Sequence, residues 1–190
     1  MAPDYVIVKG KKYYPKNQKL ILGKIGIKNI EEIVILENFQ DLKELYLFNN
    51  NITEIHGLNN LKALEKLNLY GNQIQKIENL EALSNLKVLY LSENEISKIE
   101  NLNNLKNLET LSFETNKITK IEGLENLHNL LHLNLYENNI KKIEGLGNLK
   151  KLEILRIGKN PIPQKTIERI GAIDEKGYVK NPQKWVNYCT

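Results

Sequence analysis

A 22-residue period constrains this chain more than any other feature of its sequence. One asparagine recurs at that spacing, preceded each time by a Leu-x-Leu-type pair and followed two positions later by Ile. These asparagines are Asn50, Asn72, Asn94, Asn116, Asn138 and Asn160. A period of this length predicts a solenoid, in which each repeat is one coil that buries its apolar side chains against its neighbours.

Each Leu-x-Leu pair predicts a short strand with both Leu side chains inward and the residue between them outward. The other apolar residues of a coil recur every third position, as at Ile52, Ile55 and Leu58. Because each α-helical residue turns the chain by about 100°, this spacing would spread them around a helix. We therefore expect 3₁₀ turns or extended segments on the return path of each coil.

Two polar columns predict features of the turns. The Asn after each strand is expected to be buried, with its amide group bonded to backbone groups of its own and neighbouring coils. A second column holds only Gly and Asn, at Gly57, Asn79, Asn101, Gly123 and Gly145. These two residue types best tolerate left-handed backbone, so we expect positive φ there. A β-branched residue in that column should cost about 1 kcal/mol or more.

The period divides a single domain, residues 1–190, into three parts. Residues 1–19 predict a Lys-rich hairpin that caps one end, turning at Lys9-Gly10-Lys11. Residues 20–162 hold the coils. The first coil is irregular: its strand contains the Leu20/Leu22 pair in the reading that we prefer, whereas a strict 22-residue register places Gly23 and Ile25 there.

Residues 163–190 predict a helical cap at the other end. Two prolines around Ile162 end the repeats, since proline cannot continue the ladder. Short helices are expected over 164–173 and 182–188, the second beginning at a proline. From the second helix, Trp185, Val186 and Tyr188 are expected to dock on the last coil.

Composition bounds the function. With 190 residues and 41% hydrophobic content the chain can bury one sizeable core. It has no apolar run long enough to span a membrane, its first eight residues lack the pattern of a secretory signal, and Cys189 is its only cysteine. These features predict a cytoplasmic monomer without membrane contact. The net charge of +4 combines basic ends with acidic repeats, which disfavours a nucleic-acid partner.

The pattern L-x-x-L-x-L-x-x-N-x-I-x-x-I-x-x-L resembles the leucine-rich repeat, and its Ile-rich 22-residue form resembles the SDS22-like subfamily. The resemblance implies an α/β fold: a right-handed solenoid with a parallel β-sheet on its concave side. The segment from Gly177 to Cys189 resembles the ending of stand-alone repeat proteins of Asgard archaea. It lacks the Tyr-Arg pair and the Leu-Asp ending of eukaryotic SDS22-like caps, so a role in phosphatase or small-GTPase regulation has no matching residues here.

No motif for catalysis, metal or cofactor binding emerges. His128 and His132 have the spacing of two metal ligands on a helix, but neither is expected on a helix. There is no cysteine pair and no Gly-rich phosphate loop. We therefore predict a protein that is not an enzyme and that needs no cofactor or metal.

The outward positions of the strands predict a binding surface on the concave face. They are rich in aromatic residues, which are favoured at binding hot spots. The candidate contacts are Tyr46, Phe48, Tyr70, Tyr90, Glu114, His132, Tyr136 and Arg156. Alternatively, the aromatic rings only pack against one another along the sheet. With Glu93, Glu114 and Glu137 at its border, the surface predicts a protein partner that has basic groups beside an apolar patch; a self-associating scaffold is the alternative function.

Overall fold

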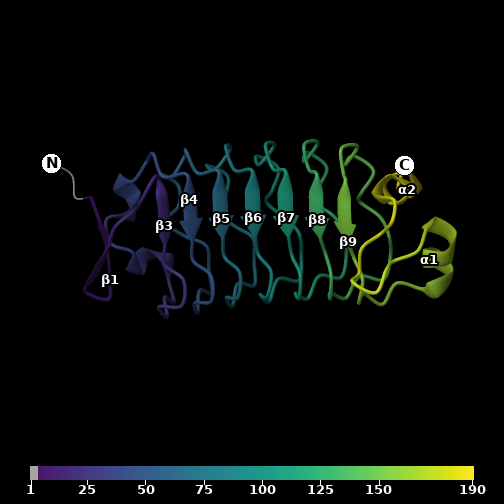
Figure 1. Cartoon of the computed structure of the whole chain (residues 1–190), viewed down its shortest axis with the longest axis horizontal. Helices are drawn as coiled ribbons and strands as arrows, with labels where there is room; N and C mark the ends of the chain where they lie inside the picture. The colour runs from purple at the N-terminus through teal and green to yellow at the C-terminus, as the bar shows by residue number, and fades with distance from the viewer. Residues whose placement is uncertain (1–3) are drawn as a thin grey trace.

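The computed structural model describes residues 4–190 as a solenoid of short stacked strands (Figure 1), so Met1–Pro3 of the predicted hairpin cap lie outside the described residues. Seven parallel strands form one sheet in chain order. They are β3 (Lys19–Ile21), β4 (Glu44–Tyr46), β5 (Lys66–Asn68), β6 (Val88–Tyr90), β7 (Thr110–Ser112), β8 (His132–Asn134) and β9 (Ile154–Arg156). The α/β solenoid with a parallel sheet and terminal caps is thereby confirmed.

The first coil follows the preferred register. Leu20 pairs with Leu45 of the next strand, which excludes the alternative with Gly23 and Ile25 in the strand. This coil alone, within residues 4–190, contains 3₁₀ helices: η1 (Ile30–Glu32) and η2 (Leu36–Asn38). Its extra residues, relative to the later period, lengthen the return path and are taken up by these two turns of helix.

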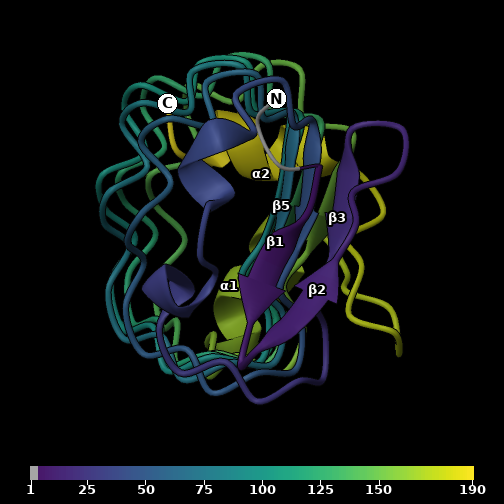
Figure 2. The ribbon, with the colours of Figure 1, turned by 90° about the vertical axis from the view of Figure 1, so that its left-hand side faces the viewer.

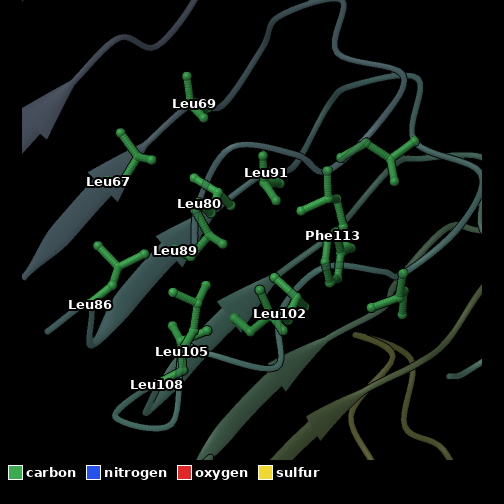
Figure 3. Packing of buried hydrophobic residues seen from close by; sticks show 14 of the residues in the cluster. Leu67, Leu69, Leu80, Leu86, Leu89, Leu91, Leu102, Leu105, Leu108 and Phe113 are labelled. Atoms are coloured by element: carbon green, nitrogen blue, oxygen red, sulfur yellow. The ribbon is translucent and has the colours of Figure 1, made fainter. Parts of the chain in front are cut away.

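The return paths of the later coils are irregular turns, as the triplet spacing predicts. The amide of Leu61 donates to the carbonyl of Leu58 (3.0 Å), and Leu64 donates to Leu61 (3.0 Å), so each Leu lies one three-residue turn after the last. All of these Leu side chains point into the coil. Figure 3 shows Leu67, Leu69 and their equivalents in the next coils forming one continuous core.

The Asn column forms a buried ladder. Asn72 donates from Nδ2 to the carbonyls of Leu47 (3.0 Å) in the preceding coil and Leu69 (2.9 Å) in its own, while its Oδ1 accepts from the amide of Ile52 (3.1 Å). The other five members of the column repeat this pattern. Every side chain in the ladder therefore bonds to its own coil and to the coil that precedes it, and its bonds between coils all run backward.

The Gly and Asn column has positive φ throughout, from 57° at Asn79 to 69° at Gly145, as predicted. The structure adds a second reason for this choice of residues. A Cβ placed on Gly145 would overlap the carbonyl oxygen of Ile121 in the preceding coil. At Asn79 the side chain instead donates to the equivalent carbonyl, that of Ile55 (2.7 Å). The carbonyl leaves no room for a Cβ at Gly123 and Gly145 and accepts a side-chain hydrogen bond at Asn79 and Asn101, whereas no carbonyl lies within 4 Å of a Cβ at Gly57.

An antiparallel hairpin lies at the N-terminal end (Figure 2), formed by β1 (Val6–Val8) and β2 (Lys11–Tyr13). Lys9 and Gly10 make its turn with φ of 50° and 74°, the left-handed pair that suits a two-residue hairpin loop. The hairpin attaches to the return path of the first coil through an antiparallel bridge between Ile7 and Val34. It forms a sheet of its own and does not extend the seven-stranded sheet.

The C-terminal cap contains helices α1 (Gln164–Ile170) and α2 (Pro182–Tyr188). The first is shorter than predicted because Gly171 ends it. Trp185 and Val186 are buried as expected, but the prediction for Tyr188 is wrong: its side chain is 41% exposed. Its ring lies 5.4 Å from the guanidinium of Arg169 on α1, so it faces the other helix of the cap instead of the last coil.

Candidate functional site

The outward strand residues lie in rows across the sheet, because successive strands pair with a shift of one period. Tyr46 aligns with Asn68, and Asn68 with Tyr90. The eight predicted contact residues all lie on this face or at its margin. All eight are half-buried instead of fully exposed, so each has neighbours in the free protein.

Tyr46 is held by charged neighbours in the N-terminal half of the face. The ammonium groups of Lys19 and Lys66 lie 4.6 and 5.4 Å from its ring centroid, and its hydroxyl donates to Glu44 (2.7 Å). This hydrogen bond, together with Lys19, holds the pKa of the Glu44 carboxyl below its usual value. The ring therefore lies close to two ammonium groups.

Phe48 and Tyr70 lie beyond Tyr46 on the same half of the face. The ring of Phe48 covers Gly23, where a Cβ would overlap it, so this aromatic residue has a packing role. The pKa of the Tyr70 hydroxyl is raised, chiefly by its hydrogen bond to Glu93 and then by burial. Each side chain therefore has a contact in the free protein, Phe48 with Gly23 and Tyr70 with Glu93, while part of each remains accessible.

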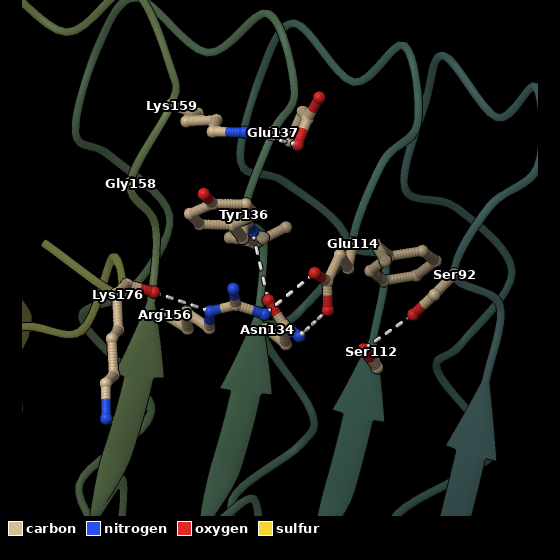
Figure 4. Close-up of polar contacts among 12 residues, drawn as sticks. Ser92, Ser112, Glu114, Asn134, Tyr136, Glu137, Arg156, Gly158, Lys159 and Lys176 are labelled. Atoms are coloured by element: carbon tan, nitrogen blue, oxygen red, sulfur yellow. Dashed lines mark hydrogen bonds and ion pairs between the residues drawn. The ribbon is translucent and has the colours of Figure 1, made fainter.

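Three predicted contacts in the C-terminal half belong to one internal cluster, which we call the Arg156 clasp (Figure 4). Arg156 forms an ion pair with Glu114 (2.8 Å) and stacks on the ring of Tyr136, 3.8 Å from its centroid. Its Nε donates to the carbonyl of Lys176 in the cap (2.8 Å), and Asn134 donates to Glu114 (2.9 Å). The clasp fastens the C-terminal cap to the sheet.

A shallow hollow of about 230 Å³ lies beside the clasp, on β6 to β9. Its lining includes Tyr90, Thr110, His132, Ile154 and Tyr178. Ile154 and Tyr178 are 42% and 40% exposed, which is high for large apolar side chains. The lining is mostly apolar, and it is formed by residues of several coils together with one residue of the cap.

The structure therefore sorts the predicted residues into three groups. Tyr90, His132 and Arg156 line the hollow, Glu114 and Tyr136 belong with Arg156 to the clasp, and Tyr46, Phe48 and Tyr70 lie further toward the N-terminus. Seven of the ten lining residues were not selected from the sequence, among them the two exposed apolar side chains, Ile154 and Tyr178. Ile154 shares a column with His132 and could have been chosen from it. Tyr178 lies in the cap, outside the period, and no sequence signal points to it.

A family model described as "Leucine-rich repeat" matches residues 55–175, well over half of the chain. The chain belongs to the leucine-rich repeat family. Its members are typically non-catalytic modules that mediate protein–protein interactions. No curated protein matches the chain.

Solved leucine-rich repeat structures share the fold. A Leptospira interrogans leucine-rich repeat protein is 30% identical with a TM-score of 0.65, covering 82% of this chain and 38% of its own. Internalin C2 of Listeria monocytogenes is 30% identical with a TM-score of 0.59, covering 77% and 74%. A second Listeria internalin, InlF, is 29% identical with a TM-score of 0.60, covering 77% of this chain and 49% of its own. The chain thus spans about half or less of two of these proteins.

Residues 4–190 contain neither a cluster of metal ligands nor a membrane-spanning helix. No group of three or more His, Cys, Asp or Glu side chains is placed to hold a metal ion. Neither helix of the cap has the length and apolar content needed to cross a bilayer, and the same is true of every other described helix.

Proposed function

We propose that this leucine-rich repeat protein is a binding module that holds a protein partner on its concave face, centred on the hollow over β6 to β9. The observation that carries the proposal is the pair of exposed apolar side chains, Ile154 and Tyr178, at the rim of the hollow. Apolar anchors in a shallow recess with polar surroundings are typical of the centre of a protein interface. The clasp supports the proposal because it fixes Tyr178 in place before a partner binds.

The charges around the hollow favour a partner that has basic groups beside an apolar side chain. Glu114 and Glu137 are paired with Arg156 and Lys159, so their charges are already balanced. Glu93, Glu109 and Glu153 are exposed and make no ion pair with any residue of 4–190. Basic groups of the partner would meet these three carboxylates, which border the strands at both ends.

Ile154→Glu tests the proposal, with Val34→Glu as the matched control. Both changes replace an exposed apolar side chain with a carboxylate. Val34 lies on the return path of the first coil, away from the hollow. Wild type and both variants are immobilised and offered an extract of the native cell. The partner would be a protein that binds wild type and Val34→Glu equally well and binds Ile154→Glu at least roughly tenfold more weakly. Retention that Val34→Glu reduces and Ile154→Glu leaves intact contradicts the proposal.

We also propose that the protein acts as a monomer in the cytoplasm and is a member of the SDS22-like subfamily. The uniform 22-residue coil and the lone Cys189 support this assignment. Elution at a mass near 22.0 kDa in sizing chromatography is the result expected for a monomer. A concentration-dependent larger species would favour the self-associating scaffold instead.

A further inference from the structure

The two edges of the seven-stranded sheet differ in how far another segment of the chain pairs with them. At the C-terminal edge, residues 177–179 run antiparallel to β9. The amides of Ile157 and Gly158 both donate to the carbonyl of Gly177 (2.8 and 3.1 Å), and Val179 donates to Leu155 (3.0 Å). This segment occupies the hydrogen-bonding groups that β9 would otherwise present, so the edge is closed.

The N-terminal edge is closed only at its beginning. Lys16 and Lys19 exchange two backbone hydrogen bonds (2.9 and 3.0 Å). The described residues before Lys16 do not pair with the edge. The hairpin β1–β2 does not continue the pairing, because it bonds to the return path at Val34. Beyond Lys19, no segment of residues 4–190 pairs with the outer side of β3.

Ile21 and Gly23 present their backbone groups on this open edge. The carbonyl of Tyr46 accepts from the amide of Leu22 (2.8 Å), and Leu20 pairs with Leu45 on the same side. In a parallel pair successive residues point alternately toward and away from the neighbouring strand. The amides and carbonyls of Ile21 and Gly23 therefore point outward, two donors and two acceptors in a row that a further strand could bind.

The side chains along the edge indicate what kind of strand fits. Ile21 is 54% exposed, an apolar side chain on an unpaired edge. Lys16, Lys19 and Lys24 lie along the same short stretch, and residues 1–30 contain seven Lys against one Asp. Lysine at an edge prevents pairing with a like-charged second copy of the chain. It attracts an extended segment that carries carboxylates.

We propose that the outer edge of β3 is a second interaction site, which takes an extended acidic segment of a partner protein as an eighth strand. The added strand bonds to the backbone of Ile21 and Gly23, places an apolar side chain opposite Ile21 and places carboxylates near Lys16 and Lys24. This is recognition by strand addition, in which backbone hydrogen bonds supply affinity and alternate side chains supply specificity. The site is separate from the concave hollow, which lies on β6 to β9.

A synthetic peptide tests the site directly. The probe is a blocked seven-residue peptide, Thr-Glu-Thr-Val-Thr-Glu-Thr, whose Glu and Val side chains share one face in either strand direction. In the free protein the amides of Ile21 and Gly23 should exchange rapidly with deuterium, and saturating peptide should slow both at least tenfold. The same peptide with Lys in place of Glu should bind at least roughly tenfold more weakly.

Ile21→Pro provides the matched variant. The change removes the outward N–H and replaces the Ile side chain, and proline is tolerated on an edge strand where that N–H faces solvent. Ile21→Thr keeps the N–H and serves as the control. The proline variant should lose roughly tenfold or more in peptide affinity while its urea midpoint stays close to that of the threonine variant.

Four results would overturn the proposal. They are slow exchange of Ile21 and Gly23 in the free protein, no binding of the Glu peptide, equal binding by the two Ile21 variants, and a dimer that Ile21→Pro dissociates. The last would make a second copy the occupant. Ile154→Glu should leave peptide binding unchanged, so failure at the edge and failure of the concave-face proposal are read from different variants.

Discussion

At the scale of single residues, the Asn ladder joins each coil to the one before it. The burial of these side chains could be predicted from their column, since a turn between buried strands has backbone groups to satisfy. The direction of the bonds could not, because a periodic sequence reads the same from either neighbour. The backward direction explains Ile25, which stands in the Asn position of the first coil, because the described residues before this coil form a hairpin and not another coil. Its own amide is served by Asn50 (3.2 Å).

Asn94→Ala should be strongly destabilising. It removes the acceptor of the Ile74 amide (3.0 Å) and the donor to Leu69 and Leu91 (both 3.0 Å), all buried. Leaving buried groups unsatisfied costs about 1–3 kcal/mol each, so we expect a loss of about 3 kcal/mol or more in urea unfolding. Asn85→Ala is the control, because Asn85 is exposed and makes one bond, to Lys62 (2.9 Å). Equal losses in the two variants would contradict a structural ladder.

Gly145→Ala separates steric overlap from backbone strain. An alanine at positive φ costs about 1–2 kcal/mol wherever it stands. Gly10→Ala should show that cost alone, since its φ is +74° and no atom lies within 4 Å of a Cβ there. Gly145→Ala adds the overlap with the Ile121 carbonyl and should lower the free energy of unfolding by at least roughly twice as much. If the two losses are the same, the carbonyl contact has no energetic role.

At the scale of elements, the coils could be predicted well, whereas the side-chain contacts that join the sheet to the cap could not. The period fixes which residues enter strands and turns, because inward positions must be apolar in every coil. The Arg156 clasp depends on a side chain that reaches across β8 to Glu114 and on a cap that folds back to it. Neither follows from a repeat. Arg156, which we predicted to contact a partner, is therefore already bonded to Glu114 and to the cap.

The 3₁₀ helix η1 gives a pH-dependent element. Glu32 accepts from the amides of Lys28 (2.8 Å) and Asn29 (2.9 Å), and these bonds hold its pKa below the ordinary 4.5. A lowered pKa in the folded state contributes stability above pH 4.5 that is lost as the pH falls through the folded value. Glu32→Gln should therefore be less stable than wild type at pH 6, with the gap narrowing as the pH falls below 4.5.

Urea midpoints at pH 6, 4 and 3 measure this gap, with Glu37→Gln as the control. Glu37 is exposed and is the second residue of η2, without a backbone bond of this kind among the described residues. A gap for Glu32→Gln that stays constant over the three pH values would show that its ionised carboxylate does not stabilise the first coil.

At the scale of the whole molecule, the period makes the structure modular, whereas the site is not. Each coil contacts only its neighbours, so fold class and register follow from the pattern. The hollow requires residues of several coils together with Tyr178 of the cap. Its outline could not be derived from the period, because the cap has no equivalent in the repeats. The same holds for the open edge of β3, which results from the point where the chain leaves Lys16.

Deleting one whole period should preserve the fold. Removal of 89–110 joins Val88 to Leu111, so an inward Leu follows the same outward residue and the Asn column remains in register. We expect one cooperative unfolding transition, weakened by about 1–3 kcal/mol for 22 fewer residues. Removal of 89–109 leaves Thr110 in the inward position and exchanges the inward and outward side chains of that strand, which should abolish the transition. Circular dichroism during thermal unfolding distinguishes the two.

The backward direction of the ladder has a consequence for how such a gene could grow. A duplicated coil carries its own connection to whatever coil precedes it, so copies can be added after any existing coil without a compensating change. Only ahead of the first coil does extension demand a second event, the replacement of Ile25 by Asn. Tandem duplication can therefore lengthen the array after any coil, but at its start it needs a further substitution. A designer who extends this protein should add coils toward the C-terminal cap.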